Sequence, residues 1–195
     1  MALNDNILKR WHNSDLVLIG GSAGSFKLIF RAVKNFSATF NKAVIIVIHR
    51  KKNFFSEIEK LFAENSRMSF REITDKEIIS QNTIYIAPAN YHVLIEKEKN
   101  FSLDVSDAVW YSKPSIDVTF ESAAEVFQER CTAILLSGAN QDGAEGLLKL
   151  KEYGALTIAQ SPAEAEMGEM PRAAIAIGAA EYILSNNELL ELLQT

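Results

Sequence analysis

The chain has 195 residues, 48% of them hydrophobic, and a formal net charge of -5 at pH 7. This length is sufficient for a single domain with a substantial core. The acidic balance argues against a nucleic-acid-binding protein, because neutralising phosphates requires a basic face. There is no run of about 20 apolar residues and no signal-peptide core. Together with a single cysteine, Cys131, this leads us to expect a cytoplasmic protein that is not embedded in a membrane.

Short β-branched runs alternate with amphipathic stretches along the chain. Strands are predicted at residues 16–19, 43–48, 83–87, 132–136, 156–159 and 182–184. Helices are predicted at residues 25–36, 54–63, 115–128, 144–153 and 187–193. Residues 92–96 and 101–105 flank a charged turn and predict an antiparallel hairpin. The alternation favours an α/β fold with a doubly wound, mostly parallel, Rossmann-like sheet covered by helices on both faces. We expect residues 1–195 to form one domain.

Three polar residues come directly after predicted strands. Ser22 follows the predicted strand at 16–19 and a pair of glycines, His49 follows a run of six aliphatic residues, and Asp142 lies in a glycine-bracketed loop after the strand at 132–136. The carboxyl ends of parallel strands meet at one edge of a sheet, where such folds bind their ligands. A serine hydroxyl becomes nucleophilic when a histidine base and an orienting carboxylate reach it. These residues are therefore candidates for a catalytic triad.

Each of these residues also has a structural explanation. The glycine-rich turn is compatible with phosphate binding, but serines occupy positions 22 and 25, where a dinucleotide-binding motif requires glycine. His49 is compatible with a packed core histidine, and Asp142 with the N-cap of the helix that follows it. Three scattered histidines and one cysteine do not form a metal-binding cluster. We expect neither a metal nor another cofactor.

Seven motifs occur in a fixed order along the chain. They are IGGSAG at 19–24, VIHR at 47–50, IYIAPANYH at 84–92, KPSID at 113–117, LLSGANQDGA at 135–144, TIAQ at 157–160 and MPRAA at 170–174. In this order the sequence resembles the catalytic domain of the chemotaxis protein-glutamate methylesterases over nearly its whole length. That family hydrolyses glutamate γ-methyl esters on chemoreceptors, and some members also deamidate receptor glutamines.

The resemblance implies a role for each matching residue. Ser22 corresponds to the nucleophile, His49 to the base and Asp142 to the orienting acid. Ala23 and Ala139 correspond to positions that line the oxyanion site. The implied partner is a methylated chemoreceptor or a similar protein, reached through the cytoplasmic part of a membrane receptor.

The sequence also departs from the family pattern. Ser25 replaces a common glycine, Ala139 replaces a frequent methionine, and the basic residues before the Pro-Ser-Ile-Asp stretch are reduced to Lys113. The first predicted strand begins near residue 16, so we expect no receiver domain ahead of the catalytic domain. These departures leave open an alternative, a catalytically silent methylesterase-like module that binds other signalling proteins.

The substrate would be presented by a protein, so the cleft should have a binding rim. The predicted rim residues are Arg50, Tyr91, His92, Lys113 and Arg172. Lys51, Lys52 and Tyr111 are further candidates, although ordinary solvated side chains would give the same pattern.

Overall fold

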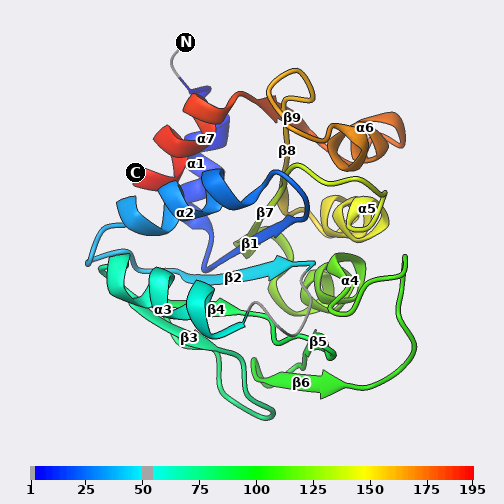
Figure 1. Cartoon of the computed structure of the whole chain (residues 1–195). Helices are drawn as coiled ribbons and strands as arrows, with labels where there is room; N and C mark the ends of the chain where they lie inside the picture. Colours follow the sequence, from blue (N-terminus) through cyan, green and yellow to red (C-terminus); the bar gives the residue numbers. More distant parts are fainter. Residues whose placement is uncertain (1–2, 50–54) are drawn as a thin grey trace.

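The computed structural model describes residues 3–49 and 55–195, which form nine strands and seven α-helices (Figure 1). The strands are β1 Leu16–Gly21, β2 Ala43–Ile48, β3 Ser69–Glu72, β4 Thr83–Ile86, β5 His92–Ile95, β6 Phe101–Asp104, β7 Cys131–Leu135, β8 Leu156–Gln160 and β9 Tyr182–Leu184. The helices are α1 Asp5–Asn13, α2 Phe26–Asn35, α3 Phe55–Asn65, α4 Ile116–Phe127, α5 Ala144–Glu152, α6 Glu169–Ala176 and α7 Asn186–Gln194.

Seven strands form one sheet in the order β3-β4-β2-β1-β7-β8-β9, and each pair of neighbours is parallel. The chain leaves β1 toward β2 on one side, whereas β7 lies against the other side of β1. The strand order therefore reverses at β1, and a doubly wound sheet binds its ligands beyond the carboxyl ends of the strands at such a point. The predicted α/β fold is confirmed.

Both faces of the sheet are covered, which explains why the strands are almost continuously apolar. In β1, Val17 and Ile19 face a core formed with α1, α2, α3 and α7. Leu16 and Leu18 face a second core formed with α4, α5, α6 and the hairpin. Figure 1 shows these two groups of helices on opposite sides of the sheet. Burying each such side chain contributes about 1.5–3 kcal/mol.

The predicted hairpin is also confirmed, since β5 and β6 pair antiparallel, with His92 opposite Asp104 and Ile95 opposite Phe101. It packs beside α4 and extends the second core beyond the sheet through Val93 and Phe101. The hairpin therefore lies next to α4, the helix that contributes backbone amides to the candidate site.

Three elements escaped the sequence prediction. Helix α1 has a polar composition and buries only Ile7 and Trp11. Strand β3 is a four-residue edge strand whose residues are exposed or half-exposed. Helix α6 has only eight residues, with a proline in its first turn, where a missing N–H has no cost. Among the described residues, no helix is both long and apolar enough to cross a membrane.

Candidate active site

A tight turn carries Ser22 from the end of β1 toward α2. A Cβ at Gly20 would come within 2.5 Å of Ile116, so glycine lets the strand pass closely beneath α4. The Ser25 amide and hydroxyl both donate to the Ser22 carbonyl, at 3.1 and 2.7 Å, and Gly24 has a φ of +82°. Helix α2 begins at Phe26, so the turn spans residues 22–25 and leaves Ser22 half-buried at the sheet edge.

His49 lies at the equivalent point of the neighbouring strand. Gly21 and Ile48 are paired in the parallel register of β1 and β2, so Ser22 and His49 are the next residues on adjacent strands. The His49 amide donates to the Gly21 carbonyl at 3.3 Å, which continues the ladder into this turn. The imidazole is 10% exposed and its Nε2 lies 2.6 Å from Asp142 Oδ2. The structure therefore brings His49 and Asp142 into direct contact beside Ser22.

Asp142 is fully buried and accepts four hydrogen bonds. Its Oδ2 accepts from His49 Nε2 and, at 2.7 Å, from the Ile116 amide. Its Oδ1 accepts from the Ser115 hydroxyl at 2.8 Å and from the Asp117 amide at 3.0 Å. Burial alone would raise the pKa of Asp142, but the bonds from His49 and from the two amides outweigh it and lower the pKa. The carboxylate remains ionised despite complete burial.

The amides that hold Asp142 belong to the first turn of α4. Ser115 is the N-cap of this helix and also accepts a hydrogen bond from the Val118 amide at 3.4 Å. The free N–H groups and the positive end of the helix dipole favour an anion at this position. The segment 113–117 therefore starts α4 and binds the Asp142 carboxylate. The sequence analysis identified this segment as a motif but assigned no function to Ser115 or Asp117.

Asp117 is a second buried carboxyl group beside Asp142. Its Oδ1 accepts from the Gly146 amide at 2.8 Å and its Oδ2 from Trp110 Nε1 at 3.2 Å. Burial, and then the negative charge of Asp142, raise the pKa of Asp117 to about 7. Near neutral pH Asp142 therefore carries a charge, whereas Asp117 is only partly ionised.

Ser137 connects the serine turn to two other loops. Its carbonyl accepts from the Ser22 amide at 2.8 Å, and its buried hydroxyl donates to the Ala23 carbonyl at 2.7 Å. The same hydroxyl accepts from the Met167 amide at 2.9 Å, and the Ser137 amide donates to Gln160 Oε1 at 2.7 Å. These bonds fix the backbone around Ser22 from β7, from β8 and from the loop before α6.

The two predicted oxyanion positions both lie on the exposed surface of this edge. Ala23 follows Ser22 in the turn, and Ala139 lies in the loop between β7 and α5. Within the part of the chain that the structure describes, neither amide N–H donates a hydrogen bond. Both are therefore available to a ligand, and their assignment as oxyanion donors stays a prediction.

The predicted rim residues have different environments. Tyr91 is 40% exposed, and Arg172 is exposed with its guanidinium 3.7 Å from Glu169. The Lys113 ammonium donates to the carbonyls of Val105 and Ser106, so it holds a loop of the protein itself. Tyr111 is fully exposed. Arg50, Lys51 and Lys52 lie outside the described residues.

His92 was predicted as a rim residue, and the structure contradicts this. Its side chain is completely buried, Nδ1 accepts from the Ser115 amide at 3.1 Å, and Nε2 lies 2.9 Å from the Asp107 carbonyl. Because one ring nitrogen accepts and the other donates, the imidazole is neutral. His92 therefore supports the start of α4 from behind the Asp142 site.

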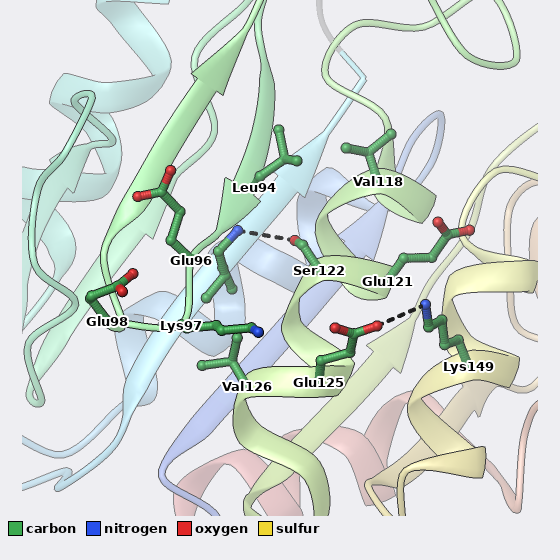
Figure 2. A pocket seen from close by; sticks show the side chains of 11 residues that line it. Leu94, Glu96, Lys97, Glu98, Val118, Glu121, Ser122, Glu125, Val126 and Lys149 are labelled. Carbon is green, nitrogen blue, oxygen red and sulfur yellow. Dashed lines mark hydrogen bonds and ion pairs between the residues drawn. The ribbon is translucent and has the colours of Figure 1, made fainter.

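A separate hollow of about 650 Å³ lies along the outer face of α4, between that helix and the hairpin (Figure 2). Four glutamates border it, and Glu125 is paired with Lys149 at 3.4 Å. None of the predicted site residues lines this hollow. Among the described residues, no three histidine, cysteine, aspartate or glutamate side chains are grouped as metal ligands would be.

The sequence model of the family described as CheB methylesterase matches residues 17–193, almost the whole chain. The chain belongs to this family. The crystal structure of the Thermotoga maritima CheB methylesterase catalytic domain superimposes with a TM-score of 0.87 at 28% identity, covering 93% of this chain and 97% of that domain.

Proteins of known name extend this comparison. A Leptospira interrogans protein, provisionally named protein-glutamate methylesterase/protein-glutamine glutaminase, is 38% identical over 92% of this chain and 93% of its own length. A Pseudomonas aeruginosa protein-glutamate methylesterase/protein-glutamine glutaminase is 36% identical over 87% of the chain, which spans 51% of that relative. The CheB relatives are thus named as methylesterases, which are ester hydrolases.

Proposed function

We propose that this chain is a serine-hydrolase-type protein-glutamate methylesterase that removes methyl groups from glutamate γ-methyl esters on a chemoreceptor or similar protein. The hydrogen bond between His49 and Asp142, formed beside the strand end that carries Ser22, is the observation that carries the proposal. A base held by an ionised, buried carboxylate next to a hydroxyl on a tight turn is the arrangement that acyl transfer requires.

The proposed reaction follows from the contacts of each residue. Ser22 Oγ attacks the ester carbonyl while His49 takes its proton. His49 Nε2 is bonded to Asp142, so Nδ1 is the ring nitrogen that accepts the proton. Asp142 stabilises the imidazolium, which then protonates the departing methoxide to give methanol. Water, deprotonated by His49, hydrolyses the acyl-enzyme, and the product is a free glutamate carboxylate.

Two backbone amides are proposed to stabilise the oxyanion. Among the described residues, the N–H groups of Ala23, in the serine turn, and of Ala139, in the Asp142 loop, have no hydrogen-bond acceptor. In comparable sites, removing one such donor lowers the rate by about 10²–10³-fold. Ser25 fixes the peptide that carries the Ala23 N–H, because its amide and hydroxyl both donate to the Ser22 carbonyl, so the donor geometry is set before substrate binds.

Release of methanol from methylated receptor membranes tests the proposal directly. The purified chain should release methanol above the background set by Ser22→Ala, and a fluorophosphonate should label Ser22. Ser22 Oγ forms no hydrogen bond within the described residues, so this substitution should leave the thermal midpoint nearly unchanged. Receptor binding without either methanol release or labelling would instead favour the alternative, a catalytically silent interaction module.

A further inference from the structure

Gln160 is a buried polar residue that the proposed reaction does not use. It is the last residue of β8, in the TIAQ motif at 157–160, and only 3% of it is exposed. Its Oε1 accepts from the Ser137 amide and its Nε2 donates to Asn186 Oδ1, each at 2.7 Å. Burying an amide side chain is costly unless its polar atoms are paired. This position is therefore built for one acceptor and one donor, and not for packing alone.

The Gln160 side chain takes the place of a backbone partner where two strands end. Leu135 and Ala159 are the last paired residues of β7 and β8, which lie side by side in the sheet (Figure 1). Beyond this pair, the Ser137 N–H donates to the Gln160 side chain. The first turn of the loop between β7 and α5 is therefore tied to β8 by a side chain.

The partners of Gln160 fix the orientation of its amide. A backbone N–H only donates, so the atom that faces Ser137 must be the oxygen. The nitrogen then faces Asn186, whose Oδ1 must accept. Asn186 is the first residue of α7, and its backbone N–H donates to Glu164 Oε2 at 2.8 Å. Gln160 thus joins Ser137 to the start of the last helix in one defined arrangement.

Ser137 carries this constraint into the candidate site. Its carbonyl accepts from the Ser22 amide at 2.8 Å, and its hydroxyl donates to the Ala23 carbonyl at 2.7 Å. Ala139, whose amide is a proposed oxyanion donor, follows two residues later in the same loop. A displacement of Ser137 would therefore move the serine turn and an oxyanion donor relative to each other.

We propose that Gln160 is a positioning residue for the reaction at Ser22: by accepting from the Ser137 amide, its side chain keeps the serine turn and the Ala139 amide at the spacing that the attack requires. This inference rests on the proposed serine-hydrolase function. Gln160 acts through Ser137 and not on the reacting atoms themselves. In enzymes, a misplacement of about 1 Å caused by a distant substitution lowers the rate by about 10²-fold.

Two substitutions of Gln160 separate positioning from stability. Gln160→Met has a similar length but no comparable acceptor, so it leaves the buried Ser137 N–H unpaired. Gln160→Glu presents an oxygen to Ser137 whether it is ionised or protonated, and the protonated form also donates to Asn186. Both variants should be less stable, the first because of the unpaired amide and the second because it buries an ionisable group. Only Gln160→Met should lose reactivity at Ser22.

Labelling of Ser22 by a fluorophosphonate measures this reactivity at a temperature where all variants are folded. The dependence of the labelling rate on probe concentration gives probe binding and the rate constant of the covalent step separately. We expect Gln160→Met to lower that rate constant by about tenfold or more without changing probe binding, because only the geometry of attack is lost. Gln160→Glu should retain most of the rate.

Thr157→Val is the matched control from the same strand. Thr157 is fully buried, and its hydroxyl donates to the Ala179 carbonyl at 2.8 Å and accepts from the Glu181 amide at 3.3 Å. This substitution should lower the thermal midpoint, as the Gln160 substitutions do, but leave the labelling rate unchanged.

The outcomes distinguish this inference from the proposed function. Full-rate labelling of Gln160→Met, or labelling rates that follow the thermal midpoints of all three variants, would refute positioning by Gln160 and leave the proposed function standing. No labelling of the unsubstituted chain would overturn the proposed function and this inference together.

Discussion

Replacing Asp142 by asparagine should separate the chemistry of the site from its structure. The carboxylate accepts from four donors: the His49 imidazole, the Ser115 hydroxyl and the amides of Ile116 and Asp117. An asparagine side chain has one oxygen and one NH₂ group, so its nitrogen must face two of these donors. The Ser115 hydroxyl can rotate and His49 can change tautomer, but a backbone amide cannot adapt.

Each orientation of the asparagine therefore leaves one buried amide unpaired. With the nitrogen at the Oδ1 position, the Asp117 N–H loses its acceptor. With the nitrogen at the Oδ2 position, the Ile116 N–H loses its acceptor and His49 is forced into the wrong tautomer. An unpaired buried donor costs about 1–3 kcal/mol, and the lost charge weakens the remaining bonds. We expect the free energy of unfolding to fall by about 2–4 kcal/mol, or about 5–15 °C in thermal midpoint.

The effect on catalysis should be larger than the effect on stability. In serine hydrolases, replacing the orienting carboxylate by an amide lowers kcat by about 10⁴-fold, because the histidine adopts the wrong tautomer. Methanol release at a temperature where the variant is fully folded measures this loss, and calorimetry measures the stability. Asp107→Asn removes the same charge from an exposed side chain and should change neither quantity. Full activity in Asp142→Asn would refute the proposed role of this carboxylate.

Two further predictions test the surroundings of the proposed triad. Ser137→Ala removes the hydrogen bond to the Ala23 carbonyl and leaves the Met167 amide unpaired. We expect calorimetry to show that the free energy of unfolding falls by about 1–3 kcal/mol, and Ser22 to react more slowly with a fluorophosphonate. An unchanged labelling rate would contradict the role of Ser137 in positioning the serine turn. The pKa of Asp117 is raised to about 7, so the folded state holds a proton that the unfolded state releases, and stability should fall as the pH rises. Between pH 6 and 8 the free energy of unfolding should fall by about 1.4 kcal/mol, which lowers the thermal midpoint by about 3–5 °C. Asp117→Asn should make the stability less dependent on pH in this range. An equal pH dependence in both chains would exclude Asp117 as its source.

Much of the fold could be predicted because its strands are buried on both faces. Strand β2, in which every residue is buried, has the predicted boundaries, residues 43–48. The edge strand β9 also has its predicted boundaries, residues 182–184, although only Leu184 of that strand is buried. The elements that escaped prediction include the half-exposed edge strand β3 and the helix α1, whose composition is polar and which buries only two residues.

The site could be predicted only in part. Parallel topology was sufficient to expect Ser22, His49 and Asp142 at one edge, since each follows a strand. Topology does not reveal which buried polar groups support them, because those contacts join residues far apart in the sequence. Asp142 accepts from Ser115, 27 positions away, and the Ser115 amide donates to His92, 23 positions away. His92 is a polar residue at the start of a strand. The sequence does not reveal whether such a residue lies exposed at the rim of a cleft or buried, with hydrogen bonds to the backbone.

Asp142 illustrates how a structural role and a proposed catalytic role can coincide in one side chain. The alternative prediction made it the N-cap of the helix that follows it, α5, but the N-cap of α5 is Gly143 and no side chain caps that helix. Asp142 instead accepts the first amides of α4, a helix from a different part of the sequence. These amides, with the positive end of the α4 dipole, keep the carboxylate charged although it is completely buried. A charged carboxylate is the partner that His49 needs in the proposed mechanism, so the interactions that begin α4 would also prepare the proposed base beside Ser22.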